Sequence, residues 1–223
     1  MSSPTAKWVG QSLPRQEDPA LLTGVARFID DLVPVAGMRH AAILRSPHGH
    51  AEIVSIDKTR AEKLPGVIGV LTGADVAAMS KPISNMISDR IKFYPCAVDR
   101  ARYFGEPVAV VVAENRYVAE DALDLLEVEY RPLPAVVDVE AAIAPDAPVL
   151  HPDVGGNALQ HRTFRYGDPD RAFRDAFRAV QVKVSYPRVN STPIETFGAV
   201  ASFDAGSDRY TIWSNFQGPF ALH

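Results

Sequence analysis

The feature that most constrains the fold is the apolar run Pro107–Ala113, which reads Pro-Val-Ala-Val-Val-Val-Ala. Because successive residues are apolar, both faces of this run must be covered, which is typical of a central strand. A helical pattern follows over Arg116–Leu126, and Glu127–Tyr130 then alternates as a further strand. This strand, helix and strand predict an α+β domain that ends near Val137.

Shorter elements precede this unit. The expected strands are Met38–Leu44, Ala51–Ile56 and Val67–Leu71, and the expected helices run from an N-cap at Asp57 to Leu64 and over Ala74–Met79. Thr72 lies just before the second helix and Asp75 follows three residues later, which is the spacing of a capping box. Residues 80–95 lack a periodic pattern, so we expect a loop there.

Proline and glycine divide the chain into four parts. Residues 1–35 predict an N-terminal arm, residues 36–140 the α+β domain, and residues 141–160 a proline-rich linker. The last part, 161–223, begins a second domain. Its expected elements are a helix from the N-cap Asp168 to Phe177, a half-buried strand Val180–Tyr186, and a hairpin of Phe197–Phe203 with Arg209–Ser214.

Composition and charge exclude several classes of protein. The net charge of -4 gives no excess of basic residues for nucleic acid. The longest apolar run, near Val108–Ala113, is far shorter than the roughly 20 residues of a membrane span. Met1–Gly10 lacks the pattern of a secretory signal, so we expect a cytoplasmic protein. Cys96 is the only cysteine, which excludes an internal disulfide and a cysteine-ligated zinc or iron–sulfur site.

The histidines predict no metal site. His48 and His50 flank Gly49, but no third ligand lies nearby, and stable metal sites usually need three or four ligands. We therefore expect both side chains on a solvent-exposed turn. The isolated residues His151, His161 and His223 are expected to be structural or to lie on the surface.

Two further polar side chains lie near the end of the chain. Glu195 precedes an apolar strand, where its carboxylate must accept backbone N–H groups or pair with a cation, so we expect a structural role. Gln217 follows the strand Tyr210–Trp213 directly. An amide at that place is usually a turn residue, although loops at strand ends often carry functional groups.

Glu127 and Glu129 share one face of their strand and are expected to face water.

Four stretches together resemble the large subunits of the xanthine dehydrogenase, aldehyde oxidase and carbon monoxide dehydrogenase family of molybdenum hydroxylases. They are Arg15–Asp31, Leu44–Ile56, Arg102–Asp138 with Gly-Glu-Pro-Val-Ala at 105–109, and Val189–Gln217. The resemblance extends over nearly the whole chain. It implies that residues 36–140 are an a/b hammerhead domain and that residues 161–223 begin a molybdopterin-binding domain.

The resemblance also implies a cofactor and a site. Phe216, Gln217 and Gly218 look like the family segment whose glutamine approaches the apical oxo ligand of the molybdenum cofactor. A neutral amide can polarise that ligand without adding charge. The resemblance implies no metal ligand and no catalytic residue in this chain, since the glutamate that acts as the base in the family belongs to later sequence. One departure is Thr196-Phe197, where many relatives have Pro-Arg.

Two functions from different classes follow. In the first, the chain is an N-terminal subunit or fragment of a hydroxylase that oxidises an aldehyde, an N-heterocycle or CO with oxygen from water. A partner chain then completes the molybdopterin site, and iron–sulfur and FAD subunits accept the electrons. Gly218–His223 resembles the start of a helix that relatives continue, which favours this function. The alternative is a non-catalytic binding or assembly module, which predicts little exposed apolar surface after Tyr186.

Overall fold

The structure, a computed structural model, describes residues 8–32, 36–83, 90–187, 189 and 192–218. The chain divides into two compact units. One, here called the large unit, is Ala36–Ala179, and the other, the hairpin unit, combines Met1–Val35 with Val180–His223. Both α-helices and antiparallel strands are present, so the α+β prediction is confirmed.

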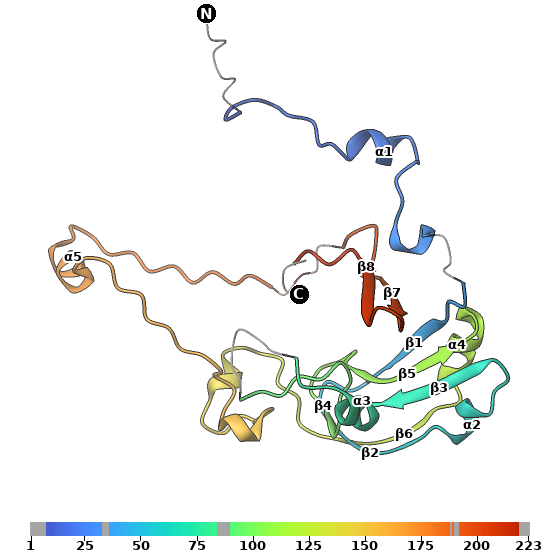
Figure 1. The fold of residues 1–223 in the computed structure, drawn as a ribbon. Coiled ribbons are helices and arrows are strands. Elements are labelled where there is room, and N and C mark those ends of the chain that lie inside the picture. The colour runs from blue at the N-terminus through green and yellow to red at the C-terminus, as the bar shows by residue number, and fades with distance from the viewer. Residues whose placement is uncertain (1–7, 33–35, 84–89, 188, 190–191, 219–223) are drawn as a thin grey trace, which may run out of the picture. The chain divides into compact units, whose positions relative to one another are not determined.

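The large unit is organised around the predicted central strand. Strand β5 (Pro107–Ala113) lies between β1 (His40–Arg45) and β3 (Val67–Thr72), and pairs antiparallel with both (Figure 1). Helix α4 (Arg116–Leu123) packs against this sheet. A strand that is apolar on both faces thus takes the central position.

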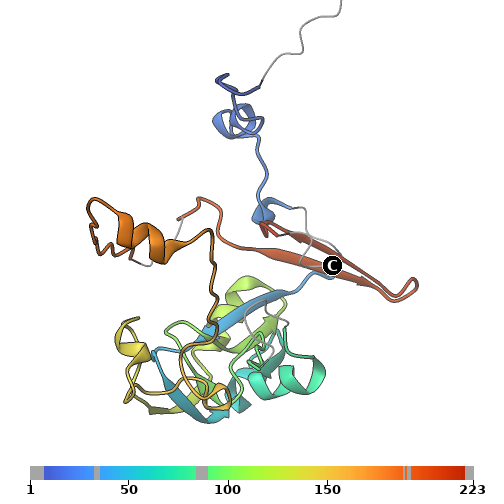
Figure 2. The same cartoon turned by 90° about the vertical axis from the view of Figure 1, so that its left-hand side faces the viewer.

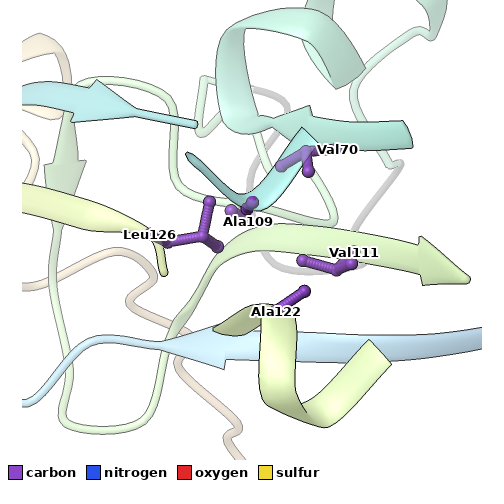
Figure 3. Close-up of a cluster of buried hydrophobic side chains, with 6 residues drawn as sticks. Val70, Ala109, Val111, Ala122 and Leu126 are labelled. Carbon is purple, nitrogen blue, oxygen red and sulfur yellow. The ribbon is translucent and has the colours of Figure 1, made fainter. Parts of the chain in front are cut away.

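The core of the large unit lies between β5 and α4. Val111 and Ala122 have no exposed surface, and they lie side by side in Figure 3. Leu126, just beyond the helix, points toward Ala109 in the same view. Burial of one such Val or Leu side chain contributes about 1.5–3 kcal/mol, so this small cluster stabilises the sheet and its helix together.

Helix α4 is shorter than predicted. The pattern favoured a helix to Leu126, but α4 ends at Leu123, where the amides of Leu125 and Leu126 donate to carbonyls three residues earlier. Such i to i−3 bonds tighten the last turn of a helix. The tight turn lets Leu126 enter the core and the chain continue at once into the next strand.

A second sheet has the order β4 (Arg100–Ala101), β2 (Ala51–Asp57) and β6 (Glu127–Pro132), with both neighbours antiparallel to β2. Glu127 and Glu129 are exposed on β6, which confirms that their shared face meets water. Alternation with a period of two places them on one side of the strand.

Two short helices connect the strands of the large unit. Helix α2 (Thr59–Glu62) has Lys58 as its N-cap instead of the predicted Asp57, although the Asp57 carboxylate does accept the Thr59 N–H at 2.8 Å. Helix α3 (Gly73–Met79) follows β3 as predicted. Within the expected loop 80–95, residues 84–89 lie outside the described residues, and Ile83 pairs with Phe93 in an isolated bridge.

The capping box of α3 is confirmed. The Thr72 hydroxyl accepts the Asp75 N–H at 3.3 Å, and the Asp75 carboxylate accepts the Thr72 N–H at 2.8 Å. The Lys58 ammonium lies 3.1 Å from the same carboxylate. The Thr72 backbone N–H, with smaller contributions from the Thr72 hydroxyl and Lys58, lowers the pKa of Asp75 to about 2. The ionised carboxylate therefore stabilises the start of α3.

We expect Asp75→Asn to lower the free energy of unfolding by about 1 kcal/mol at pH 7, the usual cost of a lost cap. Because folding depresses the pKa of Asp75, its contribution is present above the unfolded value near 3.8 and is lost as the pH falls toward about 2. The difference from wild type should shrink over that range in urea unfolding followed by circular dichroism. The exposed Asp121 provides the control variant Asp121→Asn, which should leave the free energy of unfolding at pH 7 close to that of the wild type.

The segment expected to be a linker is held by side-chain hydrogen bonds within the large unit. Its turns are η2 (Ala141–Ile143) and η3 (Pro152–Val154). The Asn157 side chain accepts the Leu150 N–H and donates to two carbonyls, each within 3.0 Å. The Arg90 guanidinium donates to the carbonyls of Asp153 and Val154. Such bonds to the backbone order a proline-rich chain without a helix or strand.

Helix α5 (Pro169–Asp175) begins as predicted. The Asp168 carboxylate accepts the Arg171 N–H at 3.1 Å, and Pro169 occupies the first helical position. The helix ends two residues before the predicted Phe177. Phe173 is 73% exposed, so no buried apolar stripe extends α5 further.

The hairpin unit contains α1 (Asp18–Leu22), η1 (Ile29–Asp31), β7 (Ala199–Asp204) and β8 (Arg209–Ser214). Strands β7 and β8 pair over their full length, which confirms the predicted hairpin (Figure 2). The Asp204 carboxylate accepts from the Gly206 N–H and the Ser207 hydroxyl, and these bonds shape the turn between the strands.

The predicted half-buried strand Val180–Tyr186 is wrong for this structure. The segment forms no strand, and its side chains are exposed, from 74% at Val182 to 85% at Tyr186. A strand needs a neighbour to satisfy its backbone groups, and no strand of the described ranges pairs with this segment. The alternating pattern of one segment does not show whether a neighbouring strand is present.

Candidate functional site

The three residues expected to contact a cofactor follow β8 directly. Phe216 and Gln217 are exposed, and Gly218 is partly buried. Among the described residues, the Gln217 side chain has no hydrogen-bond partner, so its amide is available to a ligand. Because an amide offers two N–H donors and one acceptor without charge, it suits an oxygen-rich cofactor.

Residues before β7 hold the loop that carries Gln217. The Asn215 side chain accepts the Gly198 N–H at 3.1 Å and donates to the Thr196 carbonyl at 2.9 Å. The Ser214 hydroxyl donates to the Gly198 carbonyl at 3.1 Å and accepts the Phe216 N–H at 3.2 Å. Three of these bonds connect the segment 196–198 to the segment 214–216, and the fourth, from the Phe216 N–H, lies within the second segment. We call this arrangement of four bonds the clasp.

An aromatic contact adds to the clasp. The rings of Phe197 and Phe216 meet edge to face, with centroids 6.2 Å apart, a favoured geometry for aromatic pairs. Gly218 folds back on the same ring, because a Cβ at this residue would lie 3.1 Å from a carbon of Phe216. Phe216 therefore contributes to the shape of the loop. The next residue, Gln217, is polar and exposed.

Glu195 has the structural role that the sequence predicted. Its carboxylate is partly buried and accepts the backbone N–H of Ile29 at 2.7 Å. Gly198 also faces Ile29, since a Cβ at Gly198 would lie 3.1 Å from the Ile29 side chain. The N-terminal turn and the segment before β7 are thus in direct contact, although 166 residues separate Ile29 from Glu195. Local sequence patterns give no signal for such a contact, and sequence reasoning also missed Asn215.

The expectation of an exposed turn at His48 and His50 is wrong for His50. Its side chain is 5% exposed, and its Nδ1 lies 2.7 Å from the Pro134 carbonyl. His48 is partly buried and packs its ring edge to face with Tyr130, with centroids 5.0 Å apart. The chain after β6 covers this turn, and that contact cannot be read from the local Pro and Gly residues.

Of the other histidines named from the sequence, His151 and His161 lie in the described part of the chain and join no metal cluster there. His151 is partly buried, and burial together with the positive charge of Arg102 lowers its pKa. His161 is exposed, and His223 lies outside the described residues. Within the described ranges, no group of three or more His, Cys, Asp or Glu side chains is arranged to hold a metal ion.

Glu106 is a buried acid that the sequence reasoning did not single out. It is 9% exposed, and burial raises its pKa, while the Arg102 N–H that its carboxylate accepts acts in the opposite direction. Its carbonyl accepts the Ser46 N–H at 2.8 Å. Both bonds tie the chain before β5 to neighbouring turns, so Glu106 has a structural role in the large unit.

Comparison with known proteins shows the family. Residues 23–134 match the a/b hammerhead domain of aldehyde oxidase and xanthine dehydrogenase, and residues 150–223 match a molybdopterin cofactor-binding domain. The carbon monoxide dehydrogenase large chain of Afipia carboxidovorans is 36% identical over 221 residues, which cover 93% of this chain and 27% of the relative. Subunit gamma of the 6-hydroxypseudooxynicotine dehydrogenase complex of Paenarthrobacter nicotinovorans is 38% identical, with 92% and 27% covered.

A solved structure agrees with these matches. Quinoline 2-oxidoreductase from Pseudomonas putida 86 superimposes with a TM-score of 0.81 and 39% identity, over 96% of this chain and 27% of that one. The chain thus spans about a quarter of the length of the relatives it matches. In the part of the chain that the structure describes, no helix has the length and apolar character to cross a membrane. The chain belongs to the aldehyde oxidase and xanthine dehydrogenase family, with an a/b hammerhead domain followed by molybdopterin cofactor-binding sequence.

Proposed function

We propose that the chain supplies the hammerhead domain and one wall of the cofactor site of a cytoplasmic molybdenum hydroxylase. The enzyme oxidises a small substrate, namely an aldehyde, an N-heterocycle or CO, with water as the oxygen source. Sequence beyond residues 1–223, in the same or a partner chain, completes the molybdopterin site, and iron–sulfur and FAD subunits receive the electrons. The observation that carries this proposal is the pair of adjacent family matches over residues 23–134 and 150–223.

In this proposal the loop Phe216–Gly218 lies against the molybdenum cofactor, which supplies the redox chemistry when bound. Gln217 donates an amide N–H to an acceptor oxygen of the cofactor. Its exposure and its lack of a partner among the described residues fit this role. A neutral donor that is held in place stabilises developing negative charge without the desolvation cost of a buried cation.

The exposed apolar surface of the hairpin unit supports an incomplete domain over a self-sufficient module. Ile194 is 95% exposed, Phe197 70% and Tyr210 69%. Exposed apolar side chains in such numbers mark a surface that another part of the protein covers. A stand-alone binding or assembly module predicts the opposite, because its apolar side chains would be covered by its own residues.

The two faces of the β7–β8 hairpin support the same conclusion. Val200 pairs with Trp213 on one face. On the other face, Phe203 pairs with Tyr210, and the centroids of their rings lie 4.6 Å apart. A hairpin with apolar side chains on both faces belongs inside a layered domain, because two strands alone are only marginally stable.

The test of this function is a substrate panel on the native assembly that contains the chain. An aldehyde, an N-heterocycle and CO are added separately without oxygen, and the flavin and iron–sulfur absorbance is followed. We expect one class of substrate to bleach these bands. The proposal fails if no class bleaches a preparation whose bands dithionite does bleach.

A further inference from the structure

We propose that Asn215 and Glu195 are positioning residues for Gln217, and that the N-terminal turn Phe28–Asp31 anchors the loop that carries it. This inference rests on the proposed function, because it takes Gln217 as the cofactor contact. It adds a mechanical connection from the start of the chain to the cofactor loop. The connection runs from Ile29 through Glu195 and the clasp to Gln217.

The first step is the Asn215 side chain at the open end of the hairpin. The ladder of β7 and β8 ends at the pair Ala199 and Ser214, after which backbone pairing alone no longer joins the two segments. Asn215 continues the cross-link, since its amide accepts from Gly198 and donates to Thr196. One side chain with both bonds satisfied therefore replaces a pair of ladder hydrogen bonds.

The second step is the short distance along the chain from the clasp to Gln217. The Phe216 N–H is fixed by the Ser214 hydroxyl, and its ring is fixed by Phe197. Gln217 is the next residue, so few backbone torsions separate its amide group from this fixed point. The position of Gln217 therefore depends on the segment 196–198 remaining in place.

The third step is the anchor of that segment. The Glu195 carboxylate accepts the Ile29 N–H at 2.7 Å, and Gly198 leaves room for the Ile29 side chain. The turn that contains Ile29 has an internal hydrogen bond, in which the Phe28 N–H donates to the Asp31 carboxylate at 3.0 Å. The segment 195–198 is thus held by the N-terminal turn as well as by Asn215.

Hydrogen exchange on the native assembly tests these contacts without reference to activity. Asn215→Ala should accelerate exchange at the Gly198 amide at least about tenfold, because a freed amide exchanges through small local openings. Glu195→Ala should do the same at the Ile29 amide, whereas Glu195→Gln retains an acceptor oxygen and should restore slow exchange. Ser207→Ala is the matched control. It removes the 2.7 Å hydrogen bond from the Ser207 hydroxyl to Asp204 at the far end of the same hairpin, and exchange at Gly198 and Ile29 should not change.

Steady-state kinetics of the same assemblies test the link to Gln217. Asn215→Ala and Glu195→Ala should lower kcat roughly tenfold with KM and molybdenum content unchanged, because a small displacement of a positioned group reduces catalysis. Glu195→Gln should retain kcat within about twofold of the wild type. Unchanged exchange at Gly198 and Ile29, or full kcat in variants with accelerated exchange, overturns the inference.

The outcomes also separate this inference from the proposed function. A wild-type assembly without molybdenum contradicts the function, yet the exchange rates at Gly198 and Ile29 still decide whether the clasp and its anchor hold the loop. A molybdenum-containing assembly in which Asn215→Ala changes neither exchange nor kcat contradicts the inference alone.

Discussion

Gly73→Ala is expected to destabilise the large unit by about 3 kcal/mol, at the upper end of the usual cost of overpacking. A Cβ at this residue would lie 1.8 Å from the carbonyl oxygen of Ala97 and 2.9 Å from the Cα of Val98. Both neighbours are backbone atoms, so no side-chain rotation can relieve the clash. Without this clash, replacing Gly by Ala would stabilise a helix by about 1 kcal/mol. A loss of stability in Gly73→Ala would therefore indicate the clash.

The measurement is urea unfolding of the full chain followed by far-ultraviolet circular dichroism. Tryptophan fluorescence does not report on this unit, because Trp8 and Trp213, the two tryptophans, belong to the hairpin unit. Gly69→Ala on β3 is the control, since a Cβ there meets no atom within 4 Å. A Gly73→Ala variant as stable as Gly69→Ala would contradict the close approach of α3 to Ala97.

Gln217→Ala is expected to lower kcat of the native assembly roughly 100-fold, as the loss of one positioned donor does in other enzymes. KM should change much less, because the proposed hydrogen bond goes to the cofactor and not to the substrate. The kinetic constants and the molybdenum content are measured on the same preparations, so that loss of cofactor is separated from loss of rate.

Gln181→Ala is the matched control for this prediction. Gln181 is an exposed glutamine of the same unit, so the substitution removes the same amide from a place with no proposed contact. Its kcat should equal that of the wild type. If Gln217→Ala retains kcat within twofold while molybdenum is present, the proposed contact is absent.

The sequence predicted the elements whose determinants are local. The apolar run of β5 required a central position, and the spacing of Thr72 and Asp75 produced a capping box. The hairpin of β7 and β8 followed from two alternating strands around a short polar turn. In each case the residues that decide the structure lie within a few positions of one another.

The predictions that failed depended on distant partners. Val180–Tyr186 has the alternation of a strand, but strand formation requires a neighbour that the described residues do not provide. His50 is buried because the chain near Pro134 covers it. The periodicity of α4 favoured three more residues, but the turn into β6 ends the helix first.

The candidate site was predicted only in part, and for the same physical reason. Gln217 and its neighbours were predicted from the resemblance of one continuous segment, and their contact with a cofactor stays a prediction. The contact of Asn215 with Thr196 joins residues 19 positions apart, and that of Glu195 with Ile29 joins residues 166 positions apart. Glu195 could be assigned a structural role because a carboxylate ahead of an apolar strand must accept backbone N–H groups or pair with a cation, but its partner could not be named.

The most direct test of the central claim is the molybdenum content of the native protein. The chain is isolated from cells without denaturation, its mass and partners are determined by size-exclusion chromatography with mass spectrometry, and its metals are quantified. We expect a larger assembly that contains about one molybdenum for each copy of this chain, because the proposed function gives each copy one cofactor site. A stable monomer without molybdenum would contradict the account.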